Sequence, residues 1–144
     1  MPEELILAEP YGSVLAERDV PCVIVQFHGF ANSAQFKNIM TTGLAYFAAH
    51  ARPGQPWGWV GDVRRMGAIP KQVQDWLIAE WNLRAFEAGV REVSIVVAEN
   101  ALGQQATQFY VQNTTARQDQ YEIYPAYYPS LEAAKHGAQL ALQG

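Results

Sequence analysis

The chain has one cysteine, Cys22, among its 144 residues. A single cysteine can form no disulfide within the chain and cannot build a cysteine-rich metal site. His50 and His136 lie on separate predicted helices, and neither has a second metal ligand at helical spacing. Patterns of the HExxH, CxxC, GxGxxG and GKS/T types are also missing. We therefore expect no metal and no cofactor, and we expect Cys22 to pack as a small hydrophobic residue.

Positive charge is scarce and scattered. Ten Lys and Arg residues stand against 14 Asp and Glu, the formal net charge is −4, and the densest basic pair is Arg64-Arg65. Nucleic-acid binding requires clustered cations that displace counterions, and anionic membrane surfaces attract polybasic segments. Neither a nucleic acid nor a membrane is therefore expected as a partner.

Long hydrophobic runs are absent. The longest, CVIV and VSIVVA, have the length of a strand and are too short to cross a bilayer. The acidic N-terminus lacks the basic region of a secretory signal, so we expect a cytoplasmic protein. With 49% hydrophobic residues, the chain can bury one core, and we expect a single domain over residues 1–144.

Strand and helix signals alternate along the chain. A Pro/Gly turn at residues 10–12 predicts an N-terminal hairpin, Asn32 and Gln35 form a capping-box pattern, and Gly89 is placed to end a helix. Pro125 restricts the last strand to a sheet edge or a bulge, and Ser130 is placed to cap the last helix. The predicted strands are residues 5–8, 13–18, 22–27, 57–63, 93–98 and 121–128, and the predicted helices are residues 32–51, 70–88, 100–113 and 131–142.

This order predicts an α/β fold. Alternating strands and helices form a mostly parallel sheet with right-handed crossovers. We expect about five strands, an antiparallel N-terminal hairpin at one edge, and three to four helices.

The predicted central helix, residues 70–88, carries two apolar stripes. The first stripe contains Trp81 and should face the sheet. The second, containing Trp76, Leu83 and Phe86, requires another cover, which could be a neighbouring helix, a ligand or another subunit. We expect a symmetric homodimer, another protein partner or a small apolar ligand at this second stripe.

Several segments carry a family resemblance. Asp62 closes its strand, Met66-Gly67 follow, and the central helix holds Asp75-Trp76 and Glu80-Trp81 before a Val-rich strand. A Tyr-rich strand then precedes the final helix, which begins Ser130-Leu131-Glu132-Ala133-Ala134. Over most of its length the chain resembles the SpoIIAA-like, STAS-type domains of small bacterial proteins. The resemblance implies a fold and a regulatory setting, and it implies no common reaction.

Better-known STAS regulators are phosphorylated on a Ser or Thr just after the strand that here ends at Asp62. This chain departs from them, because no Ser or Thr occurs between Thr42 and Ser94. The phosphate that drives such a switch would find no Ser or Thr hydroxyl in this segment to which it could be attached.

Polar residues follow three predicted parallel strands, and the carboxyl ends of such strands are where open α/β sheets bind ligands. One reading is a binding rim for an anion, and another is an acid/base pair in which Asp62 orients His28. The alternative is structural: Asp62 caps the following turn and the arginines pair with nearby carboxylates. The residues expected at this rim are His28, Asp62, Arg64, Arg65 and Glu99.

Taken together, these patterns favour a non-catalytic, STAS-like regulatory domain that binds a protein partner or a small, partly apolar ligand. A small-molecule enzyme that uses His28 and Asp62 is the first alternative. A structural homodimer subunit is the second.

Overall fold

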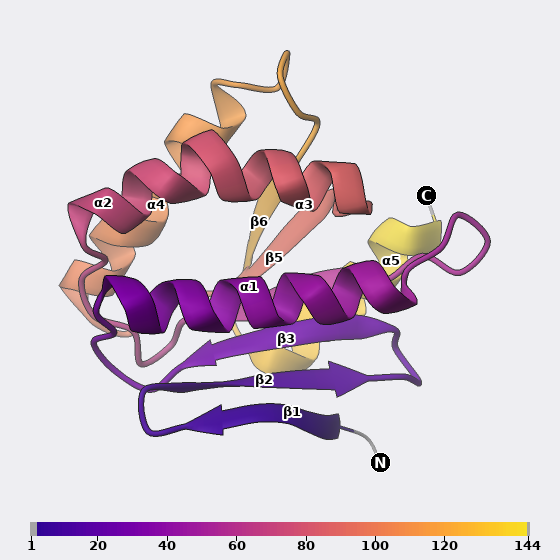
Figure 1. The fold of residues 1–144 in the computed structure, drawn as a ribbon, viewed down its shortest axis with the longest axis horizontal. Coiled ribbons are helices and arrows are strands. Elements are labelled where there is room, and N and C mark those ends of the chain that lie inside the picture. The colour runs from indigo at the N-terminus through magenta and orange to yellow at the C-terminus, as the bar shows by residue number, and fades with distance from the viewer. Residues whose placement is uncertain (1–2, 144) are drawn as a thin grey trace.

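The structure, a computed structural model, describes residues 3–143. Figure 1 shows its strands and helices. The strands are β1 (Glu3–Glu9), β2 (Gly12–Glu17), β3 (Cys22–Phe27), β4 (Gly58–Asp62), β5 (Glu92–Val96) and β6 (Tyr124–Tyr128). The helical segments are α1 (Ser33–His50), α2 (Lys71–Trp76), η1 (Leu77–Trp81), α3 (Asn82–Ala88), α4 (Ala101–Thr115) and α5 (Leu131–Gln143).

The strands form one six-stranded sheet whose spatial order follows the chain, from β1 to β6. The first three strands pair antiparallel, whereas β3, β4, β5 and β6 are parallel neighbours. The predicted α/β class and antiparallel N-terminal hairpin are confirmed. The described residues form one strand more than the expected five, because all six strand segments indicated by the sequence join the sheet.

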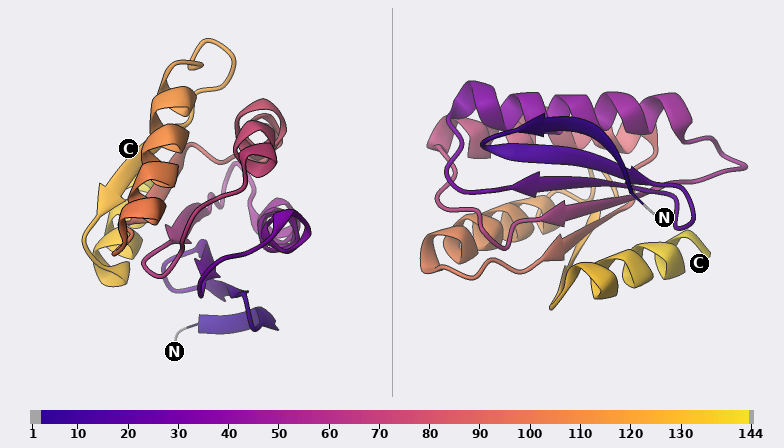
Figure 2. Two further views of the ribbon diagram at one scale, coloured as in Figure 1. Left: turned by 90° about the vertical axis from the view of Figure 1, so that its left-hand side faces the viewer. Right: turned by 90° about the horizontal axis from the view of Figure 1, so that it is seen from below.

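Helices cover both faces of the sheet, so strand residues alternate between two cores (Figure 2). In β3, Val23 and Val25 belong to the larger core, which lies beneath α1, the central helix and α4. Ile24 belongs to the smaller core, beneath Ala134 and Ala138 of α5. Both faces are buried, which explains why the parallel strands read as continuous apolar runs.

Local signals fix the helix ends as predicted. The Asn32 side chain accepts a bond from the Gln35 amide (2.9 Å), and the Gln35 side chain accepts one from the Asn32 amide (2.9 Å). Gly89 ends the central helix with φ of 115°, a conformation that glycine adopts without steric cost. The Ser130 hydroxyl accepts a bond from the Ala133 amide (3.1 Å) at the start of α5.

The central helix is one continuous helix over residues 71–88 with a π-helical turn, η1, in its middle. A π turn widens the helix locally and shifts the phase of every side chain beyond it. The buried face is therefore broader than a regular α-helix would give, and it comprises Val73, Trp76, Leu77, Ile78, Trp81, Asn82 and Ala85.

Trp81 is buried with 1% exposure and faces the sheet, as predicted. Its ring packs on Trp59 of β4 with 5.0 Å between ring centroids. Its indole N–H donates to the Met40 carbonyl of α1 (3.3 Å), which ties the central helix to its neighbour.

Of the covers expected for the second stripe, the structure shows a neighbouring helix over Trp76. Trp76 is 8% exposed, and the Lys37 ammonium of α1 lies 5.4 Å from its ring centroid. Phe86 is half-buried under the Arg91 guanidinium, 3.9 Å from the ring centroid. Of the three predicted interface residues, only Leu83 is exposed (42%). Helix α1 and Arg91 thus cover two of the three residues, and the π turn broadens the buried face. That Leu83 takes part in an interface stays a prediction.

A buried polar network holds the π turn. The Tyr121 hydroxyl donates to the Ile78 carbonyl within the turn (2.9 Å). The fully buried Asn82 amide donates to the Thr114 hydroxyl (2.9 Å) and accepts a bond from the Tyr110 hydroxyl (2.8 Å). The network therefore joins the central helix to α4 and to the segment that precedes β6.

Replacing Trp81 with alanine should lower the free energy of unfolding by about 3–5 kcal/mol, because it leaves a cavity beside Trp59. Urea unfolding measures the effect. Leu83→Ala on the exposed side of the same helix is the control and should change stability by less than about 0.5 kcal/mol. Equal small losses in both variants would contradict the burial of Trp81.

Replacing Tyr121 with phenylalanine should cost about 1–3 kcal/mol, because the Ile78 carbonyl loses its side-chain donor in a buried setting. Tyr124→Phe, on the exposed outer strand, is the matched control and should be close to neutral. Thermal unfolding of both variants provides the comparison, and a neutral Tyr121→Phe would show that the π turn does not depend on this bond.

Candidate functional site

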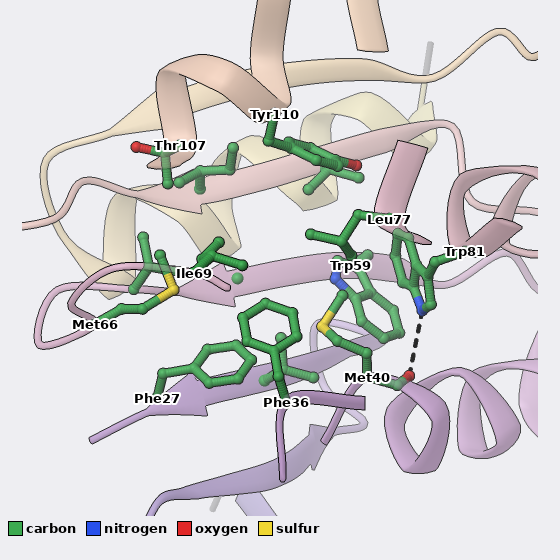
Figure 3. A pocket seen from close by; sticks show the side chains of 15 residues that line it. Phe27, Phe36, Met40, Trp59, Met66, Ile69, Leu77, Trp81, Thr107 and Tyr110 are labelled. Atoms are coloured by element: carbon green, nitrogen blue, oxygen red, sulfur yellow. Dashed lines mark hydrogen bonds between the residues drawn. The ribbon is translucent and has the colours of Figure 1, made fainter. Parts of the chain in front are cut away.

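Two hollows lie near the carboxyl ends of the parallel strands. The first, which we call the apolar cavity, has a volume of about 60 Å³ and is lined by residues of the sheet, α1, the central helix and α4. Figure 3 shows its aromatic, aliphatic and methionine side chains converging from these elements. Its walls include Phe27, Phe36, Met40, Trp59, Gly61, Met66, Leu77, Trp81, Thr107 and Tyr110.

The two hydroxyl groups in these walls are already bonded to the protein. The Thr107 hydroxyl donates to the Gly103 carbonyl (3.0 Å), and the Tyr110 hydroxyl donates to the Asn82 side chain (2.8 Å). Burial raises the pKa of Tyr110 above its usual range, so its hydroxyl stays neutral. A molecule bound in the cavity would therefore interact with the walls mainly through shape complementarity and dispersion contacts, and it would form few hydrogen bonds.

Gly61 of β4 forms an open part of the cavity wall. A methyl group placed on Gly61 would meet no heavy atom within 4 Å. The same addition at Gly58 would lie 2.9 Å from the Ala138 methyl, and at Gly43 it would lie 2.9 Å from the Trp59 ring. The space above Gly61 is thus not required for close packing.

The second hollow, the strand-end pocket, lies on the opposite face of the sheet and has a volume of about 260 Å³. The structure brings together here all five residues expected at the rim, and adds two that sequence reasoning missed. The pocket is lined by Gln26, Phe27, His28, Asp62, Arg64, Arg65 and Glu99. That these residues bind a ligand stays a prediction.

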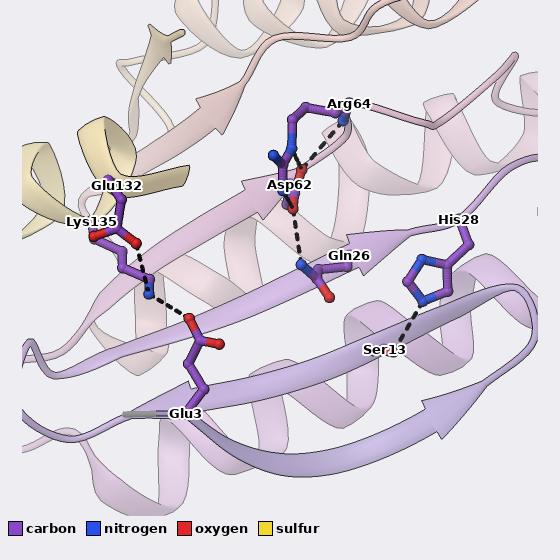
Figure 4. Close-up of polar contacts among 8 residues, drawn as sticks. All are labelled: Glu3, Ser13, Gln26, His28, Asp62, Arg64, Glu132 and Lys135. Carbon is purple, nitrogen blue, oxygen red and sulfur yellow. Dashed lines mark hydrogen bonds and ion pairs between the residues drawn. The ribbon is translucent and has the colours of Figure 1, made fainter. Parts of the chain in front are cut away.

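Asp62 is the centre of this pocket and is 5% exposed. Its carboxylate accepts two bonds from the Arg64 guanidinium, at 2.8 Å from Nε and 2.6 Å from Nη2, and a third from the Gln26 amide at 2.9 Å (Figure 4). The Arg64 backbone N–H lies 3.4 Å from the same carboxylate. Burial acts to raise the pKa of Asp62, but the bonds from Arg64 and Gln26 outweigh it and lower the pKa below its usual value.

His28 takes a different partner from the one that the acid/base reading requires. Its Nε2 lies 3.1 Å from the Ser13 hydroxyl, as Figure 4 shows. The hydrogen bonds of Asp62 in the described chain go to Gln26 and Arg64, not to His28. The geometry thus follows the structural reading of Asp62 as a turn residue paired with arginine, and catalysis by His28 and Asp62 stays an untested alternative.

A further charged cluster lies away from the strand-end pocket, where α5 crosses the N-terminal hairpin. The buried Lys135 ammonium pairs with Glu3, with Glu17 at 2.8 Å and with Glu132 at 3.6 Å. Cys22 lies on the same face and is fully buried, and burial raises its pKa to about 12, with Glu17 adding to the shift. Cys22 is therefore a packed thiol, as expected, and the cluster secures α5 to β1 and β2.

Gln26 is the missed residue with a detectable signal. It is the one polar side chain in CVIVQF, an otherwise apolar central strand, and it is the register partner of Asp62 on β4. The cavity residues on α4 carried no comparable signal, because that segment is rich in Gln and Ala.

Within residues 3–143, no group of three or more His, Cys, Asp and Glu side chains is arranged to hold a metal ion. None of the helices in this range combines the length and apolar character that crossing a bilayer requires.

Comparison with known proteins adds no assignment: no protein-family model, curated protein or solved structure matches the chain.

The pairing of Asp62 makes a prediction about pH. Because its pKa is lower in the folded than in the unfolded protein, its stabilising contribution is complete above the unfolded value of about 4 and is lost as pH falls below it. The stability advantage of the wild type over Asp62→Asn should therefore be constant near neutral pH and shrink below about pH 4.

Denaturant unfolding at a series of pH values tests this expectation. Asp75→Asn is the control, since Asp75 forms an exposed pair with Lys71 and should contribute less than about 0.5 kcal/mol throughout. An Asp62→Asn difference that grows on acidification would reverse the predicted sign.

Proposed function

We propose that this chain is a non-catalytic, STAS-like regulatory domain whose apolar cavity binds a small, uncharged, apolar molecule. The observation that carries the proposal is the open space above Gly61, walled by aromatic and methionine side chains. The order of strands and helices supports a STAS-like assignment only at the level of the α/β fold.

The cavity chemistry favours this class of ligand. A hollow lined mainly by apolar side chains is poorly suited to water and binds apolar molecules instead. A charged ligand would lose its hydration without gaining an ionic partner, since no charged side chain lines the cavity. At about 60 Å³, the cavity accepts only a few non-hydrogen atoms as it stands. The flexible side chains of Met40 and Met66 give it some capacity to expand.

The position of the π turn supports a regulatory role. Leu77 and Trp81 lie at the two ends of η1, and both line the cavity. Single π turns inside α-helices are frequent at functional sites. An occupant that presses on Leu77 and Trp81 would thereby alter the helix that presents Leu83 to the outside.

Protein association is the weaker candidate. It depended on an open stripe, and two of the three residues in that stripe are covered within the chain. The Leu83 side chain alone offers too little apolar area to form a stable interface. Association through the outer side of the central helix remains a prediction that sedimentation of the purified protein would test.

Filling the cavity should separate ligand binding from folding. Gly61→Val places a β-branched side chain in the open space, and it should stabilise the strand by about 0.5–1 kcal/mol while displacing the ligand. Gly54→Val is the matched control, because Gly54 also has no heavy atom within 4 Å of an added methyl but lies in a loop outside the cavity. Benzene is larger than the cavity as it stands, so its binding requires Met40 and Met66 to move, and the methyl NMR shifts of these two residues report that movement.

Wild type and Gly54→Val should show saturable benzene shifts, and Gly61→Val should not. Native mass spectrometry of the purified proteins would reveal any molecule retained from the cell in the first two. If Gly61→Val destabilises the domain by about 1–3 kcal/mol, the space is tightly packed and the proposal fails. Absence of benzene shifts in the wild type would lead to the same conclusion.

A further inference from the structure

The Arg64 guanidinium has N–H groups that are not used in its pairing with Asp62. It carries five N–H groups in a rigid plane. The bonds to Asp62 use Nε and one hydrogen of Nη2, and the other donors bond to none of the described residues. The side chain is 40% exposed and lines the strand-end pocket, so its outer edge is open to a ligand.

Asp62 and Gln26 hold this guanidinium in a fixed orientation. The Asp62 carboxylate accepts two hydrogen bonds from the guanidinium, at Nε and Nη2. Gln26, the register partner of Asp62 on the neighbouring strand, donates to the same carboxylate and holds it in place. Long arginine side chains normally lose conformational freedom when they bind a ligand. Here that loss has already occurred on folding, which is the arrangement expected of a preorganised binding residue.

The remaining wall of the pocket defines the ligand. Arg65 adds further donors, His28 adds an imidazole ring, and the Asp62 charge is matched by Arg64. Glu99 supplies an acceptor on the same wall, so a fully ionised anion would meet one repulsive group. An oxyanion that also carries a hydroxyl, such as protonated phosphate, can bond to the arginines and to Glu99 together.

We propose that the strand-end pocket binds a small oxyanion, a phosphate or a carboxylate, through the outer edge of Arg64, with Asp62 and Gln26 as positioning residues. Planar bidentate recognition of this kind is what distinguishes arginine from lysine. The pocket and the apolar cavity lie on opposite faces of the sheet, because Gly61 and Asp62 are consecutive residues of β4. This inference therefore stands or falls independently of the proposed function.

The test is a titration of the isotope-labelled full chain with inorganic phosphate and, separately, with acetate, at constant ionic strength. Backbone amides of residues 26–28 and 62–65 and the Arg64 Nε–H report binding. We expect saturable shifts, with tighter binding of phosphate than of acetate. Arg64→Gln should weaken phosphate binding at least about tenfold, because two charge-assisted bonds are lost.

Three further variants define the mechanism. Arg64→Lys keeps the charge but lacks the planar fork, so it should bind phosphate almost as weakly as Arg64→Gln. Arg65→Gln leaves the pairing with Asp62 intact, and it should weaken binding to a smaller extent in a chain that folds normally. Arg84→Gln removes an exposed charge on the central helix, outside the pocket, and should change affinity by less than about twofold.

Several results would overturn the proposal. No saturable shift in the wild type would show that the pocket does not bind oxyanions. An equal loss in Arg84→Gln would show that phosphate responds only to total charge. Wild-type affinity in Arg64→Lys would show that a point charge suffices and that the fork held by Asp62 has no role. Gly61→Val should bind phosphate as the wild type does, whatever its effect on benzene.

Discussion

The contact between Trp59 and Trp81 sets the distance between the central helix and the sheet. Their rings meet at 5.0 Å between centroids, and the Trp81 indole is also bonded to α1. Two residues along β4 from Trp59, on the same face, Gly61 has no side chain at all. Large rings at one point hold the helix away from the sheet, and the missing side chain at the next point leaves space beneath it. The apolar cavity results from the large rings of Trp59 and Trp81 together with the missing side chain at Gly61. Protein interiors are otherwise packed closely enough to fill such a gap.

The π turn is where this packing meets the rest of the molecule. Its Ile78 carbonyl is bonded by Tyr121, and the next turn carries the buried Asn82. Buried polar groups that are fully satisfied specify one arrangement, because each alternative leaves a donor or acceptor without a partner. The helix is thus held in its phase by polar contacts to α4 and to the segment before β6, while its apolar side lines the cavity. An occupant of the cavity would act on η1, where the hydrogen bonding is π-helical.

The same strand places different chemistry on the two faces of the sheet. Gly61 faces the helices and opens the apolar cavity, whereas Asp62 faces the other way and organises Arg64. The α5 helix is secured over this second face by Lys135, which pairs with glutamates of β1, β2 and α5 itself. That helix leaves the carboxyl end of β4 uncovered, and the strand-end pocket lies there. The alternation of the strand keeps the apolar and polar hollows separate.

The sequence alone determined the fold class, the helix ends and the meeting of polar residues at the strand ends. Capping at Asn32, a left-handed glycine at Gly89 and the alternation of strands and helices are properties of neighbouring residues. Only the tertiary structure decided that Trp76 is covered by α1, that Gln26 bonds to Asp62, and that open space lies above Gly61. These outcomes depend on side chains brought together from distant segments and on a π turn that shifts the helix phase. The spacing of apolar residues within one segment of sequence predicts neither the contacts between distant segments nor the π turn.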